Sequence, residues 1–495
     1  MSIDLHTVNL HPVDHLPPSL TDHDFDLIVV GAGSTGENVA SRAIAGGLSV
    51  AVVEAELVGG DCSYWACMPS KALLRPGEAL DDARHVGGAA HAVTGTLDVA
   101  AVLARRDKFN SGFDDASQVD WVVGIGATFV RGHGRITGER RVRVTGSDGS
   151  TAELTARHAV ALCVGSAPAL PPIDGLAGVG AWTNREATAA TAVPGHLVVL
   201  GGGVVGVEMA TAWATLGAEV TLLEGAGQLL PTYEPKAGEL VAASLAAAGV
   251  DVRTGIKMTA ARREGPMVTV TLEGGGEISG DELLVAVGRT PKTHDVGLES
   301  IGLDGGHWLE VDDAMAVTAV SGGWLYAVGD CNDRAKLTHI GKYEARVAGD
   351  VIAARANNEP DSRSPAPFSR FAATATARAV PQVVFTNPQV GSVGLTETAA
   401  RSAGIAVRAV DYDMGALAGS ALYSDDYRGW ANLVVDTDRN VVVGATFVGP
   451  NAGELVHGAT IAVVGEVPLD RLWHAVPSYP TISEIWLRLL EAWGL

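Results

Sequence analysis

The chain repeats one pattern, a buried strand followed by a glycine-rich loop, a helix and a second strand, and this repeat restricts the possible folds. An apolar run enters the loop Gly31–Gly36 in the first copy and the loop Gly201–Gly206 in the second. Glu54 and Glu224 each end the second strand, 23 residues after the first glycine of their own copy. Such a loop offers backbone N–H groups at a helix start to a pyrophosphate. The repeat therefore predicts two Rossmann-like dinucleotide-binding units.

The glycines and acids of the repeat are the first candidate binding residues. They are Gly31, Gly33, Gly36 and Glu54 in the first copy, and Gly201, Gly203, Gly206 and Glu224 in the second. An acid at the end of the second strand is expected to accept hydrogen bonds from ribose hydroxyls. Glu224 would also repel a 2′-phosphate, and no arginine follows it before Arg253. The second unit is therefore expected to prefer NADH over NADPH.

Length and composition limit the remaining possibilities. A chain of 495 residues with 47% hydrophobic and 5% aromatic residues predicts about three domains of α/β type. The net charge of -22 argues against nucleic acid or an anionic membrane as partner. No apolar run reaches the roughly 20 residues that span a bilayer, and the first 24 residues carry Asp, His and Pro where a signal peptide is apolar. We expect a soluble cytoplasmic protein.

Weaker patterns complete the outline of the chain. Alternating residues between about 120 and 165 predict an antiparallel insertion, and the Pro-, Ser- and Ala-rich stretch 355–379 predicts a linker. Beyond it, strands are expected near 382–386, 430–435 and 441–448, with helices after them. Together these predict a C-terminal α+β domain.

Two of the four cysteines lie close together, just before an amphipathic helix. Cys62 and Cys67 are five positions apart, and Lys71 follows one helical turn later. In a regular helix five residues rise about 7.5 Å, more than the Cα separation of a disulfide. If the two cysteines bridge, the backbone must bend there, and a strained bridge is easily reduced. The alternative is two unconnected buried thiols and a solvated lysine. Cys163 and Cys331 are expected to be small buried hydrophobes.

The cysteine segment Gly59–Lys71 resembles a family signature. It is similar to the G-G-x-C-x4-C-x-P-S-K motif of the pyridine nucleotide-disulfide oxidoreductases, which include dihydrolipoamide dehydrogenase, glutathione reductase and mercuric reductase. Four further segments resemble landmarks of this family in the same order: Val164–Pro168, Val287–Pro291, Thr318–Asp330 and Phe385–Gly394. The resemblance covers nearly the whole chain.

This resemblance implies an α/β fold with two Rossmann-like nucleotide-binding domains, for FAD and NAD, and a C-terminal α+β dimerisation domain. Residues 25–165 and 291–365 would form the FAD-binding domain, 166–290 the NAD(P)-binding domain and 366–495 the dimerisation domain. Residues 1–24 would be an N-terminal extension.

The resemblance also implies roles for individual residues. FAD would be bound by the first glycine loop, Gly165 and Asp330, and NADH by the second loop and Gly288. Electrons would pass from NADH through the flavin to a Cys62–Cys67 disulfide. Cys67 would face the flavin, Cys62 would meet the outside substrate, and Lys71 would pair with Glu208 beside the flavin.

One position departs from the family pattern. Disulfide reductases of the family carry His-Pro-Thr-x-x-Glu near the C-terminus, whereas here Tyr479 takes the place of the histidine and Glu484 is retained. In a homodimer Tyr479 would reach the partner subunit's active site. A tyrosine of pKa about 10 is a poor base at neutral pH compared with a histidine of about 6.5, which lowers rates by about 10² to 10⁴. His474, five residues upstream, would substitute only if the loop folds back; a surface or cap role is expected for it.

The sequence leaves the identity of the electron acceptor undecided among several small molecules. Mercuric reductases also carry a tyrosine at this place, but they deliver the metal through a C-terminal cysteine pair, and no cysteine follows Cys331 here. Trp65 between the cysteines is expected to be a packing residue, with a reshaped flavin cleft as the alternative. The acceptor is a disulfide, a quinone-like molecule, a metal ion or oxygen, and no resident metal is expected. Two other functions remain: a flavoprotein subunit or sensor in a larger assembly, and an NADH oxidase that does not use the cysteines.

Overall fold

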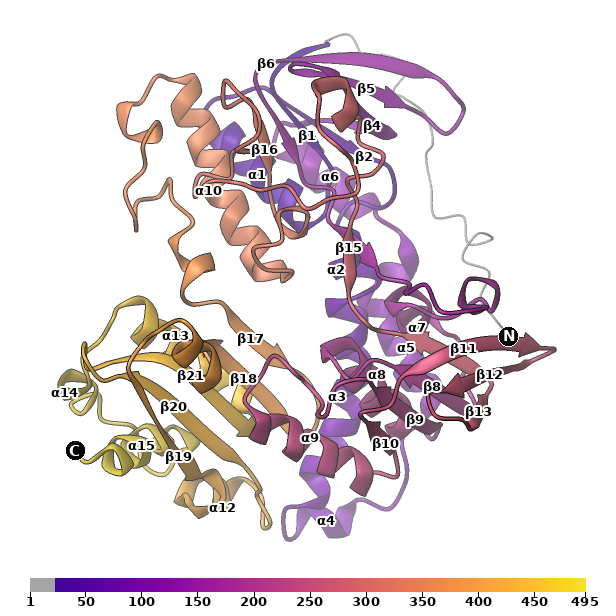
Figure 1. Cartoon of the computed structure of the whole chain (residues 1–495), viewed down its shortest axis with the longest axis vertical. Coiled ribbons are helices and arrows are strands. Elements are labelled where there is room, and N and C mark those ends of the chain that lie inside the picture. The colour runs from indigo at the N-terminus through magenta and orange to yellow at the C-terminus, as the bar shows by residue number, and fades with distance from the viewer. Residues whose placement is uncertain (1–22) are drawn as a thin grey trace.

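The computed structural model describes residues 23–495, arranged as two nucleotide-binding units and a C-terminal unit (Figure 1). The expected N-terminal extension, residues 1–24, lies almost entirely outside the described residues. The first strand starts at Asp24, two residues before the apolar run that predicts it. The two units, the antiparallel C-terminal sheet and its helices confirm the α/β class with a C-terminal α+β domain.

The first unit is built on a seven-stranded sheet. Its order is β3-β2-β1-β6-β5-β4, with β16 beside β6. The strands are β1 (Asp24–Val30), β2 (Val50–Glu54), β3 (Thr128–Arg131), β4 (His133–Gly138), β5 (Arg141–Thr145), β6 (Thr151–Leu162) and β16 (Leu325–Ala327). β4 and β5 run antiparallel, as the alternation predicts, and the other strands are parallel. β1 is apolar and buried from Leu27 to Val30, as expected where helices cover both faces of a parallel sheet.

Helices α1 (Ser34–Ala45) and α10 (Thr338–Ala356) pack closely beside this sheet. A Cβ atom at Gly349 would lie 2.6 Å from the Cβ of Arg42, so only glycine permits this approach. Arg42 and Asp350 then form an ion pair at 2.7 Å across the two helices. Near the start of α10, a Cβ atom at Gly341 would lie 2.5 Å from the Thr35 hydroxyl oxygen, so this end of the helix lies close to the first glycine loop.

The second unit repeats the parallel arrangement with the order β10-β9-β8-β14. The strands are β8 (His196–Leu200), β9 (Glu219–Glu224), β10 (Asp251–Thr254) and β14 (Glu282–Val285). A separate antiparallel sheet, which the sequence patterns did not predict, contains β11 (Met258–Glu264), β12 (Met267–Leu272) and β13 (Glu277–Gly280). The chain enters and leaves this unit through the short antiparallel pair β7 (Ser166–Pro168) and β15 (Arg289–Pro291).

Eight further helices precede the C-terminal unit in the described chain. They are α2 (Gly60–Tyr64), α3 (Cys67–Arg84), α4 (Ala89–Ala92), α5 (Val99–Phe109), α6 (Ala116–Gly124), α7 (Asn184–Ala189), α8 (Val204–Thr215) and α9 (Pro235–Ala247). Leu73 and Leu74 of α3 share one apolar core with α8 and with Val384 and Val448 of the C-terminal unit. The helix that starts at Cys67 is therefore packed against all three parts of the molecule.

The C-terminal unit is a five-stranded antiparallel sheet in the order β17-β18-β21-β20-β19. The strands are β17 (Pro381–Val384), β18 (Gln389–Gly394), β19 (Val407–Asp413), β20 (Trp430–Asp436) and β21 (Val441–Gly449), and the helices are α11 (Glu397–Ser402), α12 (Ala418–Tyr423), α13 (Ala452–Val464), α14 (Leu469–Leu472) and α15 (Ile485–Trp493). β17, β20 and β21 lie where the sequence predicts strands. The predicted linker holds two of the short 3₁₀ turns, which are Ser111–Phe113, Leu176–Gly178, Leu298–Ile301, Asp330–Asn332, Pro360–Ser362, Thr374–Ala377, Met414–Ala416 and Ile482–Glu484. Within residues 23–495, every helix is too short or too polar to cross a bilayer.

Candidate redox site between the two nucleotide-binding units

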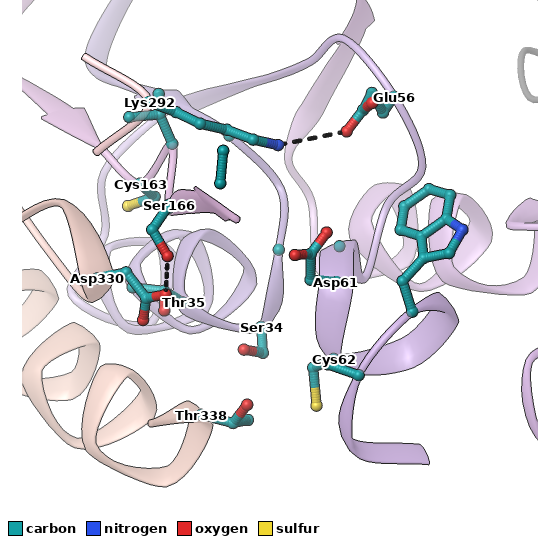
Figure 2. Close-up of a pocket in the computed structure, with 18 of the residues that line it drawn as sticks. Ser34, Thr35, Glu56, Asp61, Cys62, Cys163, Ser166, Lys292, Asp330 and Thr338 are labelled. Carbon is teal, nitrogen blue, oxygen red and sulfur yellow. Dashed lines mark hydrogen bonds and ion pairs between the residues drawn. The ribbon is translucent and has the colours of Figure 1, made fainter. Parts of the chain in front are cut away.

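A cavity of about 580 Å³ runs from the first glycine loop to the start of α8. Nine of the predicted site residues line it: Gly31, Gly33, Glu54, Cys62, Cys67, Lys71, Gly165, Glu208 and Asp330. Figure 2 shows Ser34, Cys62 and Thr338 gathered at one end and the Glu56–Lys292 ion pair at the other. The fold thus brings together residues that are hundreds of positions apart in the chain.

The two glycine loops have the same local geometry. A Cβ atom at Gly36 would lie 1.9 Å from the carbonyl oxygen of Gly31, and one at Gly206 would lie 1.8 Å from that of Gly201. These glycines let each helix start directly against its strand. A Cβ atom at Gly203 would meet nothing within 4 Å, so the backbone there faces open space. The space at each helix start fits a pyrophosphate bound by backbone N–H groups.

Each unit also holds its acid in the same way. Glu54 accepts hydrogen bonds from the N–H groups of Ala32, at 2.6 Å, and Glu56, at 2.7 Å. Glu224 accepts from Gly202 and Ala226, both at 2.6 Å. Burial raises the pKa of Glu54 above its usual range. The carboxylates therefore shape the glycine loops as well as standing at the strand ends where a ribose would bind.

The cysteine segment bends as a bridge between the two thiols requires. Helix α2 ends at Tyr64, Ala66 has φ -137° and ψ -100°, and α3 starts at Cys67. Both cysteines are free thiols, partly buried, and within hydrogen-bonding reach of each other.

The two thiols differ in acidity. The hydrogen bond from Cys62 lowers the pKa of Cys67 to about 6, helped by the Thr338 hydroxyl at 3.2 Å and the charge of Lys71, and opposed by burial and by Glu208. The same bond, together with burial, raises the pKa of Cys62. Both shifts favour Cys67 as the thiolate of the pair and Cys62 as the protonated thiol.

We expect Cys67 to react with an alkylating reagent at lower pH than Cys62 does, because its pKa is lower. Because the pKa of Cys67 is about 6, its thiolate fraction rises through pH 6, whereas an ordinary cysteine ionises near pH 8.5. Iodoacetamide alkylation of Cys67, followed by mass spectrometry in a Cys62→Ala variant and in the native pair, measures both profiles. The native midpoint should lie near pH 6 and should move upward in the variant; equal midpoints would contradict the assignment.

Lys71 and Glu208 form the expected ion pair beside the cysteines. Lys71 Nζ lies 2.7 Å from Glu208 Oε2, and Glu208 Oε1 accepts the N–H of Phe385 at 2.9 Å. The Phe385 ring centroid lies 4.8 Å from Lys71 Nζ, a cation–π contact. Helix α3, helix α8 and the end of β17 therefore meet at one buried carboxylate.

Several polar residues of the site, Asp61, Ser166, Arg289 and Thr338, were not predicted from the sequence. The Ser166 hydroxyl donates to Asp330 at 2.5 Å, and Arg289 reaches both Ser166 and Asp61. The sequence did point to Ser166 and Arg289, since they lie in Val164–Pro168 and Val287–Pro291, two of the segments that resemble family landmarks. Thr338 had no such signal, because it lies 271 positions from Cys67.

The C-terminal candidates lie outside this cavity. Tyr479 is 75% exposed, and His474 is also exposed, as expected of a surface histidine. Glu484 is buried and bonds Arg488 at 2.6 Å, while its Oε2 has no hydrogen-bond partner among the described residues. Tyr479 belongs to a set of exposed apolar side chains of the same unit, with Leu422, Ile461, Val464, Trp473 and Val476.

The remaining expectations concern packing. Trp65 is 1% exposed and packs with Leu57 and Tyr64, so it is a packing residue, although its edge also lines the cavity. Cys163 and Cys331 are buried in the first core, which confirms that they are small hydrophobes. Burial raises the pKa of both thiols, so neither competes with Cys67 as a thiolate.

Comparison with known proteins agrees with this geometry. Residues 25–345 match the family model of the pyridine nucleotide-disulphide oxidoreductases, and residues 380–489 match the dimerisation domain of the same family. The dihydrolipoyl dehydrogenase of Haloferax volcanii is 31% identical over 94% of this chain and 95% of its own length. The mercuric reductase of Staphylococcus aureus is 29% identical over 94% of this chain and 81% of its own length.

Two solved structures show the same fold. LpdA from Mycobacterium tuberculosis has a TM-score of 0.79 at 25% identity, over 95% of this chain and 100% of that chain. The flavoprotein disulfide reductase RclA from Escherichia coli has a TM-score of 0.79 at 22% identity, over 95% and 99%. The dimerisation domain and the exposed apolar set around Tyr479 support homodimer formation.

The cavity fits the flavin that this family uses. Its glycine loop opens onto space at a helix start. Gly165 has a positive φ of 70°, and a Cβ atom there would meet nothing within 4 Å, so the backbone leaves room for a ligand. Asp330 lies in the same cavity, where a ribityl chain would need an acceptor. The chain belongs to the pyridine nucleotide-disulphide oxidoreductases and is a flavin-dependent enzyme that uses FAD and a nicotinamide nucleotide.

Proposed function

We propose that this enzyme oxidises NADH and reduces a small-molecule acceptor through a Cys62–Cys67 disulfide. FAD, when bound, relays two electrons between the nicotinamide and the sulfurs. In balance, NADH, one proton and the disulfide yield NAD⁺ and two thiols; the thiols then pass two electrons and two protons to the acceptor and the disulfide re-forms. The observation that supports this best is the position of Cys62 and Cys67 at the break between α2 and α3, in one cavity with the Lys71–Glu208 ion pair.

Each residue of the site has a separate role in the proposed reaction. Cys67, with the lower pKa, is the sulfur that exchanges electrons with the flavin, and Cys62, which retains its proton, meets the acceptor. Lys71 stabilises the thiolate by its charge, and Glu208 orients Lys71. Asp330 is held by Ser166, ready to bind the ribityl chain.

NADH is the proposed donor because Glu224 stands at the end of β9. Two backbone N–H groups hold its carboxylate in place, so it cannot swing away from a 2′-phosphate without losing both bonds. Repulsion between the two anions would then disfavour NADPH. The matching geometry of Glu54 in the first unit supports a site built for an unphosphorylated ribose.

One acceptor panel tests the proposal. The holoenzyme is assayed with NADH and with NADPH against lipoamide, glutathione disulfide, Cu(II), Hg(II), a quinone and oxygen. We expect kcat/KM to be larger with NADH, and at least one acceptor other than oxygen to be reduced with new alkylatable thiols at Cys62 and Cys67 under anaerobic NADH. Turnover with oxygen alone and no new thiols would contradict it.

Tyr479→His is expected to raise the reduction of small disulfides by roughly tenfold or more. A histidine accepts and returns the proton of the exchanging thiol, which a neutral tyrosine does poorly. Glu484 Oε2, without a partner among the described residues, is free to accept the new N–H. The measurement is kcat/KM for lipoamide, with Tyr479→Phe as control. An unchanged rate in the histidine variant would show that Tyr479 does not limit the reduction of disulfides.

A further inference from the structure

The break between α2 and α3 leaves the backbone around Trp65 with groups that no helix satisfies. Trp65 is the C-cap residue that follows α2, and the final carbonyls of a helix have no partner within it. Its carbonyl oxygen accepts the Asn184 amide at 2.8 Å, and the Thr188 hydroxyl lies 3.2 Å away. Both side chains come from α7 and both are buried. The bend between the cysteines is thus bonded to an element of the second unit.

A second contact joins the same helix to the other side of the segment. The Arg185 guanidinium lies 4.1 Å from the Trp65 ring centroid and donates to Asp61 at 2.9 Å. It also forms a bidentate pair with Glu56, 2.8 Å for each bond. Asp61 directly precedes Cys62. Its other carboxylate oxygen accepts a hydrogen bond from Arg289 at 3.0 Å. One arginine therefore contacts residues on both flanks of Cys62.

Helix α7 is itself held in place. A capping box of Thr183 and Glu186 closes its start, and Arg106, 1% exposed, donates to the carbonyls of Thr188 at 2.5 Å and Ala190 at 2.9 Å. Trp182, just before the helix, bonds the β14 backbone in both directions. A series of hydrogen bonds therefore connects β14 of the second unit, through Trp182 and α7, to the cysteine segment.

We propose that Arg185 and Asn184 are positioning residues that hold Cys62 and Cys67 at bridging distance, acting through Asp61 and Trp65. The consequence is a high effective concentration of one thiol at the other. This deepens the proposed function, because it presupposes that the two cysteines form the redox disulfide. A substitution that loosens the segment between the two cysteines lowers the equilibrium constant for forming the disulfide. The disulfide of such a variant is then reduced in a more oxidising buffer than the native disulfide is.

A positioning role and a purely electrostatic role of Arg185 predict different results. Arg185→Lys keeps the charge but loses the planar fork that bonds Glu56 and Asp61 together. If position matters, Arg185→Lys and Arg185→Gln both lower the closing constant by roughly tenfold. If only charge matters, the lysine variant behaves as the native enzyme, which would overturn the proposal. Asn184→Ala, which removes one uncharged hydrogen bond, is the milder variant and should shift the constant in the same direction.

The experiment equilibrates each holoenzyme in glutathione redox buffers and counts alkylated Cys62 and Cys67 by mass spectrometry. Arg370→Gln is the matched control, since Arg370 also stacks on an aromatic ring, Phe371 at 4.6 Å, and pairs with a carboxylate, Glu359, away from the site. Thermal unfolding of every variant separates loss of folding from loss of position. A native enzyme that forms no disulfide in any buffer would defeat the proposed function. A native disulfide with Arg185 and Asn184 variants no different from Arg370→Gln would defeat the positioning role alone.

Discussion

Replacing both Cys62 and Cys67 with serine is expected to lower NADH-driven reduction of a disulfide acceptor by on the order of a thousandfold or more. The effect is large because the two sulfurs act as one unit: neither can carry two electrons to the acceptor without the other. The single variants should therefore lose nearly as much as the double variant. Stopped-flow absorbance after anaerobic NADH should also lack the long-wavelength band of a thiolate beside the flavin.

Cys331→Ala is the control for this experiment. Cys331 is fully buried in the core of the first unit, so its loss should cost about 1 kcal/mol of stability and leave the reduction rate unchanged. If the double serine variant keeps native turnover with any acceptor in the panel, the cysteines are idle. The enzyme would then be an NADH oxidase or a flavin-only reductase. If turnover appears only when a partner protein is added, a role as a subunit of a larger assembly is favoured.

Replacing Lys71 with methionine is expected to have the second largest effect, on both stability and chemistry. Glu208 is 3% exposed, so removing Lys71 leaves a buried carboxylate with one bond, to the Phe385 N–H. We expect a loss of about 2 kcal/mol in the free energy of unfolding. The pKa of Cys67 should rise as well, because the charge of Lys71 lowers it. Urea unfolding and the pH profile of Cys67 alkylation measure the two effects.

A double-mutant cycle separates the pair from its surroundings. Lys71→Met with Glu208→Gln removes both charges, so the double variant should be more stable than Lys71→Met alone, with a coupling energy of about 1 kcal/mol or more. Lys236→Met is the matched control, because Lys236 pairs with Glu239 at 3.0 Å on an open surface. It should change stability by less than about 1 kcal/mol. Equal losses in Lys71→Met and Lys236→Met would contradict the buried-pair interpretation.

Much of the fold follows from local patterns in the chain. The two strand–glycine–helix repeats predict both parallel sheets, because the glycines let each helix start directly against its strand. The alternating stretch between 120 and 165 predicts the antiparallel β4 and β5. The pattern failed for β11, β12 and β13, whose short alternating runs of partly exposed residues are weak signals beside the longer buried strands.

The site was predictable where its residues lie together in sequence. Cys62, Cys67 and Lys71 lie close together in sequence, and the spacing of the cysteines predicts a bend if they bridge, which agrees with the break at Ala66. Glu208 could be placed only through the family resemblance. Arg185 and Thr338 carried no sequence signal, because each belongs to a different element and reaches the cysteine segment only when those elements pack. Phe385 lies in a segment that resembles a family landmark, but its contact with Glu208 could not be predicted from that resemblance.

The chain by itself determined which chemistry is available: two nucleotide-binding loops, one pair of neighbouring thiols, and a tyrosine where relatives that reduce disulfides carry a histidine. Only the tertiary structure shows why Cys67 is favoured over Cys62 as the thiolate. That choice depends on the Cys62 hydrogen bond, the Thr338 hydroxyl, the charge of Lys71 and the degree of burial. Electrostatic and hydrogen-bond energies depend on distance and on exclusion of water, and both are set only when α2, α3, α8 and α10 come together.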